Sequence, residues 1–419
     1  MRAGIIGSGL GGLLAAVSLA RRGSEVVIFE KLPYAGGRFT NIERSGYQLS
    51  TGALHMIPHG EKGPLARMLR TLGISVQIKT SKPEGLFRIN GKDYLFDELP
   101  ELFSMKEKLK LTAALASLKL DRGGKESLRE WLEKRINSKL LLQIADSFCG
   151  WALSVDSSKV SSGETAAITK NVNKFGGPGV PLGGCGGVTK ALVSELERLG
   201  GKILYGMEVE KIEIENGRAA NIATKEDSYD FDMIISNAGP KATIKLCGEE
   251  NFPASYVREI KNIEEAAGIK ILATCEKAML GHSGVLFTPQ AQRIDGLNEV
   301  TNADPSLAPK GRHLLMSHQA LDASQNAAKE VKLGIEDLHA IFPDFDRHCK
   351  VLAVHVYKSG WPVNRAVSGV RISPESPIKN LYHVGDAVKP KGWMESEGVA
   401  AGVELLLGHL QKRKRILLH

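Results

Sequence analysis

A run of small residues near the start of the chain has the types and spacing that bind the pyrophosphate of a dinucleotide. Its members are Gly7, Ser8, Gly9, Leu10, Gly11 and Gly12. Gly7 permits a tight turn, Gly9 lets the backbone approach the phosphates, and Gly12 lets a following helix pack closely on the preceding strand. The free amide groups and the positive end of that helix would then stabilise the phosphate charge.

Glu30 extends this nucleotide chemistry to the sugar. It ends a second apolar stretch, where a carboxylate can accept a hydrogen bond from a ribose hydroxyl. The same carboxylate would repel the additional phosphate of NADP. The residues therefore favour an adenosine diphosphate with free ribose hydroxyls, which leaves NAD and FAD open.

The elements that must position these residues can be recognised around them. A strand at Arg2–Gly7, an amphipathic helix containing Ala15 and Ala16, and a strand at Glu25–Glu30 surround the glycine run. With 45 glycines in 419 residues, an isolated match to the glycine pattern would carry little weight. The strand, the helix and the acid at the end of the second strand together argue against a chance match.

Length and element order predict two interleaved domains. A chain of 419 residues exceeds the size at which one core stops growing. We expect an α/β fold in which residues 1–59, 176–240 and 351–419 form a Rossmann-like nucleotide domain, a parallel sheet with a β-meander. Asn216-Gly217 between two alternating runs predicts a hairpin of that meander. Residues 60–175 and 241–350 would form an inserted α+β substrate domain, with a largely helical first part that includes Ser127–Phe148.

Composition limits the classes of protein. No apolar run is long enough to span a bilayer, and a strand beginning at Arg2 leaves no room for a signal peptide, so we expect a cytoplasmic protein. The five cysteines lie far apart, without metal-ligand spacing to histidines. They predict reduced structural thiols, no redox-active disulfide and no metal site.

Basic residues account for a net charge of +8 and are concentrated in two stretches. Ser104–Leu120 has apolar residues at helical spacing with lysines between them, and Lys412–Arg415 forms a basic tail followed by Ile416, Leu417 and Leu418. These stretches fit either solvated helix faces or peripheral contact with a membrane surface. No aromatic residues alternate with the lysines to stack on bases, so no nucleic acid partner is expected.

Several segments resemble those of the flavin amine oxidase and phytoene desaturase superfamily. They are the glycine run with Glu30, Gly36-Gly37-Arg38, Gly183–Thr189, Val209, Ser236-Asn237-Ala238, Leu381–Asp386 and Gly392–Gly402. The resemblance implies FAD as cofactor and covers most of the nucleotide domain but little of the inserted one. It adds these residues to the cofactor-binding set: Lys31, Gly37, Thr51, Gly52, Ala53, Leu54, Asn237, Gly385, Gly398 and Val399.

The resemblance also implies roles for individual residues. Arg38 would hold the pyrophosphate or the flavin side of FAD, where a guanidinium can bind oxygens in a forked geometry. Val209 would hold the adenine through its backbone, and Asp386 would meet ribitol or pyrophosphate hydroxyls. The helix opening near Gly398 would direct its dipole at the flavin pyrimidine ring, where negative charge develops on reduction.

Two residues are candidates for chemistry beside the flavin. His55 ends a segment that in the family runs along the isoalloxazine ring, so it could orient substrate or move a proton. Lys270 lies in a predicted strand that could approach the flavin as the lysine of the amine oxidases does. The alternatives are a structural histidine with satisfied hydrogen bonds and a solvated or paired lysine.

The function expected from this resemblance is hydride exchange between flavin N5 and a lipophilic isoprenoid or carotenoid-like substrate. Desaturation, saturation and isomerisation all remain open, and electrons would come from or go to an external partner because only one dinucleotide fingerprint is present. One alternative is an amine or protoporphyrinogen oxidase. Another is a non-redox prenyl-binding protein on the same fold, as the Rab escort and GDP dissociation inhibitor proteins are.

Overall fold

A five-stranded parallel sheet forms one half of the molecule. The computed structural model describes residues 1–120, 124–322 and 324–416. The strands of the sheet lie in the order β19-β13-β1-β2-β9, and every neighbouring pair is parallel. The strands are β1 (Arg2–Ile6), β2 (Glu25–Glu30), β9 (Lys202–Tyr205), β13 (Met233–Ser236) and β19 (Leu381–His383). The strand–helix–strand unit predicted around the glycine run is confirmed, with α1 (Leu10–Ala20) as the helix.

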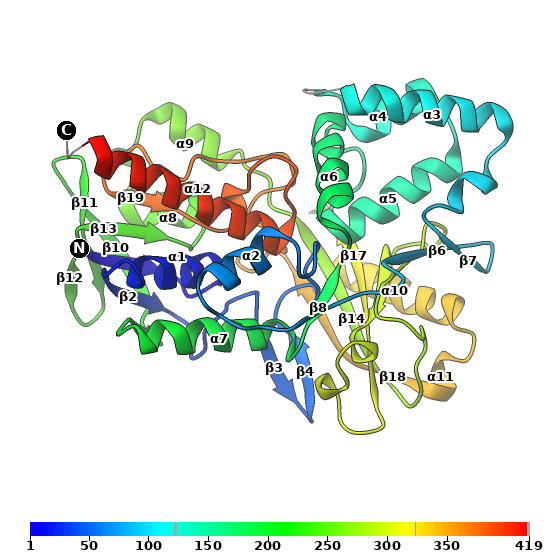
Figure 1. Ribbon diagram of the computed structural model, residues 1–419, viewed down its shortest axis with the longest axis horizontal. Helices are drawn as coiled ribbons and strands as arrows, with labels where there is room; N and C mark the ends of the chain where they lie inside the picture. The colour runs from blue at the N-terminus through cyan, green and yellow to red at the C-terminus, as the bar shows by residue number, and fades with distance from the viewer. Residues whose placement is uncertain (121–123, 323, 417–419) are drawn as a thin grey trace.

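Two layers cover this sheet, as expected for parallel strands that need both faces buried. On one face, α1 packs with α2 (Pro64–Thr71), α7 (Gly184–Arg198) and α12 (Glu395–Ile416) in one hydrophobic cluster (Figure 1). The other face carries a meander and two helices: β10 (Val209–Glu215), β11 (Arg218–Thr224), β12 (Ser228–Asp230), α8 (Pro240–Cys247) and α9 (Ala254–Lys261). Asn216 and Gly217 adopt φ values of 50° and 71° between β10 and β11, which confirms the predicted hairpin.

A mixed sheet of seven strands forms the other half of the molecule, in the order β18-β14-β17-β16-β15-β6-β7. These strands are β6 (Gly85–Ile89), β7 (Lys92–Leu95), β14 (Ala267–Cys275), β15 (Val285–Phe287), β16 (Gly296–Glu299), β17 (His313–Leu321) and β18 (Cys349–Tyr357). Figure 1 shows a group of helices at one end of it, α3 (Met105–Leu120), α4 (Leu128–Arg135), α5 (Lys139–Leu153) and α6 (Ser162–Phe175), and a second group, α10 (Ala327–Ile341) and α11 (Phe345–His348). Two small antiparallel pairs, β3 (Asn41–Arg44) with β4 (Tyr47–Ser50) and β5 (Ile78–Thr80) with β8 (Gly179–Pro181), complete the strands.

One sequence expectation about these elements was wrong. The strand β18, inside the range 351–419 assigned to the nucleotide domain, pairs with β14 of the seven-stranded sheet. The stretch from residue 60 to residue 175 is largely helical as expected, with α2 to α6 in it, and it also contains β5, β6 and β7. Within that stretch, the run Ser127–Phe148 forms two helices, because Asn137 adopts a φ of 52° between α4 and α5.

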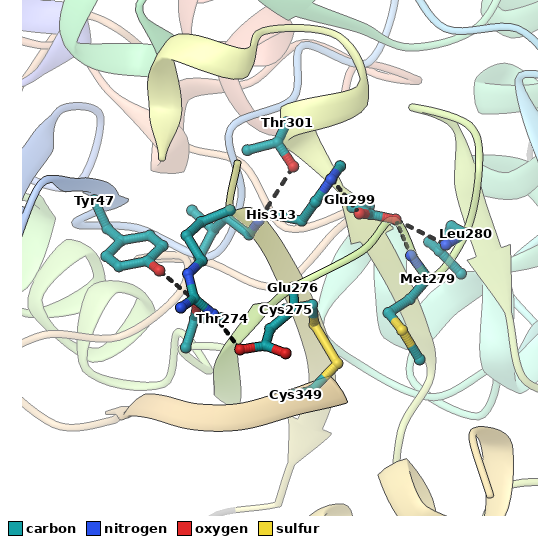
Figure 2. The surroundings of a disulfide bond; sticks show 12 residues. Tyr47, Thr274, Cys275, Glu276, Met279, Leu280, Glu299, Thr301, His313 and Cys349 are labelled. Carbon is teal, nitrogen blue, oxygen red and sulfur yellow. Dashed lines mark hydrogen bonds and ion pairs between the residues drawn. A yellow bond between two sulfur atoms is a disulfide. The ribbon is translucent and has the colours of Figure 1, made fainter. Parts of the chain in front are cut away.

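The cysteines also differ from expectation, because Cys275 and Cys349 form a disulfide (Figure 2). The two residues lie directly opposite each other at the ends of the antiparallel strands β14 and β18. A separation of 74 residues concealed this pairing in the sequence. Cys149, Cys185 and Cys247 are free and buried, as predicted for structural thiols.

None of the helices in the described ranges is both long enough and apolar enough to cross a membrane. The backbone of α12 continues through the basic Lys412–Arg415 to Ile416. Leu417 and Leu418 lie outside the described residues.

Candidate cofactor site

A cavity of about 700 Å³ opens where the parallel strands end. The residues that follow β1, β2, β13 and β19 all line it, which is the place where open α/β sheets bind their ligands. The predicted cofactor-binding residues that line the cavity are Gly7, Gly9, Leu10, Gly11, Glu30, Lys31, Gly37, Arg38, Gly52, Ala53, Leu54, Val209, Asn237, Gly385, Asp386 and Val399.

The glycines of this cavity form a cradle whose backbone packs against neighbouring segments with no room for a side chain. A Cβ on Gly11 would lie 2.9 Å from the backbone nitrogen of Gly385, and one on Gly9 would lie 2.4 Å from Asn237 Nδ2. The N-cap of α1 is Gly9, which supplies no side-chain cap, so the first amides of the helix are available to a ligand. Gly12 does not line the cavity but allows the close packing predicted for it, since a Cβ there would lie 2.1 Å from Gly7 O.

Glu30 is buried and held in position at the cavity by backbone and side-chain donors. Its Oε2 accepts hydrogen bonds from the amide and hydroxyl of Ser8, at 2.7 and 2.6 Å, and its Oε1 accepts one from the Leu32 amide at 2.9 Å. Ser8 therefore orients the carboxylate and does not itself line the cavity. This arrangement fixes an acceptor where the sequence predicted a ribose hydroxyl.

Arg38 and Asp386 come from distant parts of the chain and contact each other in the wall of the cavity. The guanidinium of Arg38 donates to Asp386 Oδ2 at 2.8 Å and to the carbonyl oxygens of Pro362 and Val363. Burial alone would raise the pKa of Asp386, but the charges of Arg38 and Lys389 outweigh this effect and hold its pKa below the usual range. An ionised carboxylate and a fixed guanidinium therefore border the site together.

The start of α12 reaches the cavity three residues earlier than predicted. The helix begins at Glu395, and Glu395, Ser396 and Val399 line the cavity, whereas Gly398 packs against Lys389, whose Cγ a Cβ would meet at 2.5 Å. The Oγ of Ser396 is buried and has no hydrogen-bond partner among the described residues. An unpaired buried hydroxyl in a cavity at a helix N-terminus fits a bound ligand that supplies the missing partner.

The glutamates of this helix end have different surroundings. Burial raises the pKa of Glu395 to about 7, and the charge of Lys389 opposes this rise. The Oε2 of Glu397 accepts a hydrogen bond from the amide of Leu65 at 2.7 Å and so supplies an acceptor at the start of α2. Only Glu395 of the two lines the cavity.

His55 does not line the cavity. Its Nε2 donates to the carbonyl of Gln48 at 2.8 Å, and its Nδ1 accepts the amide of Cys185 at 3.3 Å. Burial lowers its pKa to about 4, which keeps the ring neutral. The structural interpretation of His55 therefore fits the geometry, and a direct part in chemistry does not.

Lys270 and Thr51 also lie behind the cavity wall rather than in it. Lys270 is fully buried and donates to Ser50 O at 2.6 Å, Ser50 Oγ at 2.8 Å and Gly52 O at 2.6 Å. Burial lowers its pKa to about 7. The Thr51 hydroxyl donates to Gly37 O at 2.8 Å. Both residues thus support the backbone of segments that line the site.

Sequence reasoning missed other residues of the cavity wall. Asn364 and Arg365 reach the site from the loop after β18, and Glu395 and Ser396 precede the glycine on which the sequence argument focused. The second pair lies just before a predicted helix and within Gly392–Gly402, a segment that carries the resemblance, and these were the signals that could have found it.

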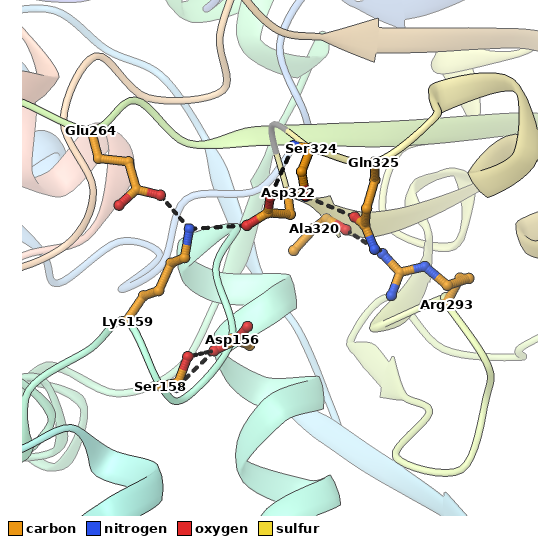
Figure 3. A network of polar contacts seen from close by, with 9 residues as sticks. All are labelled: Asp156, Ser158, Lys159, Glu264, Arg293, Ala320, Asp322, Ser324 and Gln325. Carbon is orange, nitrogen blue, oxygen red and sulfur yellow. Dashed lines mark hydrogen bonds and ion pairs between the residues drawn. The ribbon is translucent and has the colours of Figure 1, made fainter.

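A second cavity, of about 810 Å³, lies beside the first and has a charged lining. Lys159 lies between Glu264 and Asp322, and contacts the latter at 3.2 Å (Figure 3). Pro362 lines this cavity, whereas its neighbour Trp361 lines the first. This polar lining does not match a lipophilic substrate.

Known proteins resemble the chain over most of its length. The family model for flavin containing amine oxidoreductases matches residues 10–396. An uncharacterized protein of Methanocaldococcus jannaschii is 45% identical over 98% of this chain and 99% of its own. The prolycopene isomerase of Daucus carota is 27% identical over 74% of this chain, which spans 60% of that protein.

Solved structures also superpose on the chain over most of its length. An oxidoreductase from Methanosarcina mazei superposes with a TM-score of 0.93 at 43% identity, covering 97% of this chain and 100% of the other. A putrescine oxidase superposes with a TM-score of 0.75 at 15% identity, over 98% and 99% of the two chains, which shows a shared fold.

Proposed function

Because the chain belongs to the flavin containing amine oxidoreductases and is therefore an FAD-dependent oxidoreductase, we propose that its substrate is a lipophilic, isoprenoid-like molecule. One observation carries this proposal. Ala53, Leu54 and Met56 line the cofactor cavity and belong to a hydrophobic cluster that also contains Trp151 and Phe287. An apolar molecule approaching the cavity from this cluster meets side chains that favour its transfer from water.

The relatives support the same substrate class. Prolycopene isomerases and a 1-hydroxycarotenoid 3,4-desaturase match this chain at 25–27% identity.

The chain's own residues provide binding, orientation and charge at the cofactor. The glycine cradle and the start of α1 would hold the pyrophosphate, Glu30 a ribose, and Arg38 with Asp386 the middle of FAD. Bound FAD supplies the two-electron chemistry by accepting or giving a hydride.

The start of α12 sets the electrostatics of the site. Its positive end favours negative charge beside Ser396 and Val399. Glu395 can hold or release a proton near neutral pH, because burial raises its pKa to about 7. A neutral Glu395 leaves the favourable effect of the helix dipole intact.

Anaerobic incubation of the holoenzyme with polyene isoprenoids tests the proposal. We expect a change in the flavin absorbance of the oxidised or the photoreduced enzyme, or a change in the polyene. The polyene would change either in mass by two hydrogens or in double-bond geometry alone. Oxidation of putrescine or protoporphyrinogen with no effect on any polyene would overturn it. A protein that cannot be loaded with FAD would instead be a prenyl-binding relative.

A pair of glycine variants links the reaction to the cavity. Gly11→Val places a side chain against the Gly385 backbone, so we expect loss of FAD and of turnover. Gly408→Ala is the matched control, because a Cβ at Gly408 meets nothing within 4 Å. Turnover by a flavin-free Gly11→Val protein would contradict the assignment of the site.

A further inference from the structure

The first turns of α3 direct apolar side chains outward rather than toward the protein. Met105 is 73% exposed and Leu109 is 67% exposed, and Ala113 and Ala116 on the same face are exposed as well. Most proteins bury large apolar side chains on helices against a core. We call these four residues the α3 stripe.

The orientation of α3 follows from contacts on its other side. Ala114, on the opposite face, is 4% exposed and belongs to the hydrophobic cluster that contains Trp131. Ser104 and Glu107 cap the helix reciprocally, since the Glu107 amide donates to Ser104 Oγ and the Ser104 amide donates to Glu107 Oε2. The stripe is thus exposed by a packed and capped helix, at the outer edge of the helical group in Figure 1.

Lysines border the α3 stripe on both sides. At 100° per residue, the exposed Lys106 and Lys110 follow one edge of the stripe and Lys108 lies beyond the other. Lysine side chains beside an apolar stripe can extend their ammonium groups to lipid phosphates while their stems cover apolar surface. A helix that binds in the plane of an anionic bilayer has this pattern.

We propose that the α3 stripe docks on an anionic lipid surface. A second copy of this chain is a poorer occupant, because pairing two stripes would bring their flanking lysines together. The proposal rests on the proposed function, since a lipophilic substrate dissolves in such a surface.

The core beneath α3 fits the delivery of a lipophilic molecule. Leu102 and Phe103, just before α3, belong to the same hydrophobic cluster as Leu54 and Met56, which line the cofactor cavity. Apolar packing therefore extends from the base of α3 to the cofactor site. Docking through the stripe would place this part of the molecule against the membrane.

Flotation of the holoenzyme with vesicles tests the proposal without substrate. We expect flotation with phosphatidylcholine vesicles that contain phosphatidylglycerol, and much less with phosphatidylcholine alone or in high salt. Met105→Ser with Leu109→Ser should lower the partition coefficient by about tenfold or more. Lys106→Glu with Lys110→Glu should remove the dependence on phosphatidylglycerol.

The matched control replaces two exposed apolar residues elsewhere. Ile42 and Leu405 are 47% and 41% exposed, and Ile42→Ser with Leu405→Ser should float as the unaltered protein does. Equal flotation of the stripe variant, absence of flotation with either vesicle, or a dimer in light scattering that the stripe variant abolishes would overturn the proposal.

The vesicle result and the proposed function can fail separately. Turnover of a detergent-solubilised polyene does not need docking, so the stripe variant should retain that activity. Vesicle binding by a protein that acts on no polyene would leave the docking surface standing and remove the proposed substrate.

Discussion

Lys270 is a buried lysine whose three hydrogen bonds all end on the chain segment that borders the cofactor cavity. Its Nζ donates to Ser50 O, Ser50 Oγ and Gly52 O, and the Tyr357 hydroxyl donates to Gly52 O as well, at 2.7 Å. Lys270 therefore positions this segment and does not touch the site itself.

Lys270→Met should destabilise the protein, because it leaves the buried Ser50 carbonyl without the lysine donor. We expect the free energy of unfolding to fall by about 2 kcal/mol, measured in urea, together with weaker FAD binding. Lys332→Met is the control, since that side chain is 79% exposed. Equal urea midpoints for the two variants would rule out the positioning role.

Glu395 should couple stability to pH, because burial raises its pKa to about 7. Between its ordinary pKa and about 7, the folded protein keeps a proton that the unfolded chain releases, so the contribution of Glu395 to stability is lost as pH rises through this window. Gln cannot ionise. We expect FAD-free Glu395→Gln to be more stable than the unaltered protein at pH 8, by about 3 kcal/mol at most, and similar to it at pH 4.5.

Thermal unfolding at the two pH values measures this difference. Glu61→Gln, on the exposed surface, serves as the control and should show no such divergence. A Glu395→Gln advantage that is the same at both pH values would assign the effect to packing instead of ionisation.

At the scale of elements, the sequence predicted what local patterns determine. The glycine run, its flanking strands and the Asn216-Gly217 hairpin depend on neighbouring residues, and the structure has them where they were expected. The pairing of β18 with β14 and of β6 with β15 joins segments far apart in the chain. No local period distinguishes such partners, so domain boundaries drawn from the sequence missed them.

The residues of the candidate site also divide into those that a local pattern indicates and those that only the folded chain brings to the site. Gly9, Glu30 and Arg38 could be found because a local motif contains them. The roles of Arg38 and Asp386 at the cofactor came from the resemblance, which did not indicate that the two side chains contact each other. Arg365 gains its place from the path of the whole chain, which explains why no local pattern indicated it, whereas Ser396 lies in a segment that carries the resemblance but was given no role there.

The disulfide tests the pairing of β14 with β18. Linking residues 74 apart restricts the unfolded chain, so Cys275→Ala with Cys349→Ala should lower the free energy of unfolding by about 4 kcal/mol. Dithiothreitol should shift the unaltered protein to the same urea midpoint and leave the variant unchanged. A thiol titration of the denatured, unreduced protein should find only Cys149, Cys185 and Cys247 free. Five reactive thiols would mean that the strands pair without the bond.

At the scale of the whole molecule, the cofactor cavity is built from segments spread over the chain. Residues 6–56, 207–246 and 361–399 contribute to its wall, and Arg38 joins the first of these to the last through Asp386. A ligand that contacts all three segments binds the folded state and has no comparable site in the unfolded chain.

FAD should therefore stabilise the entire molecule in one transition. At a free FAD concentration of about 100 times the dissociation constant, mass action adds about 2.7 kcal/mol to the free energy of unfolding. Urea unfolding followed by intrinsic fluorescence and by circular dichroism measures this gain, and the two signals should shift together. The Gly11→Val protein should show no gain, whereas Gly408→Ala should show all of it. If FAD shifted one signal and left the other in place, the parallel sheet and the seven-stranded sheet would unfold independently, and the cavity would belong to one of them alone.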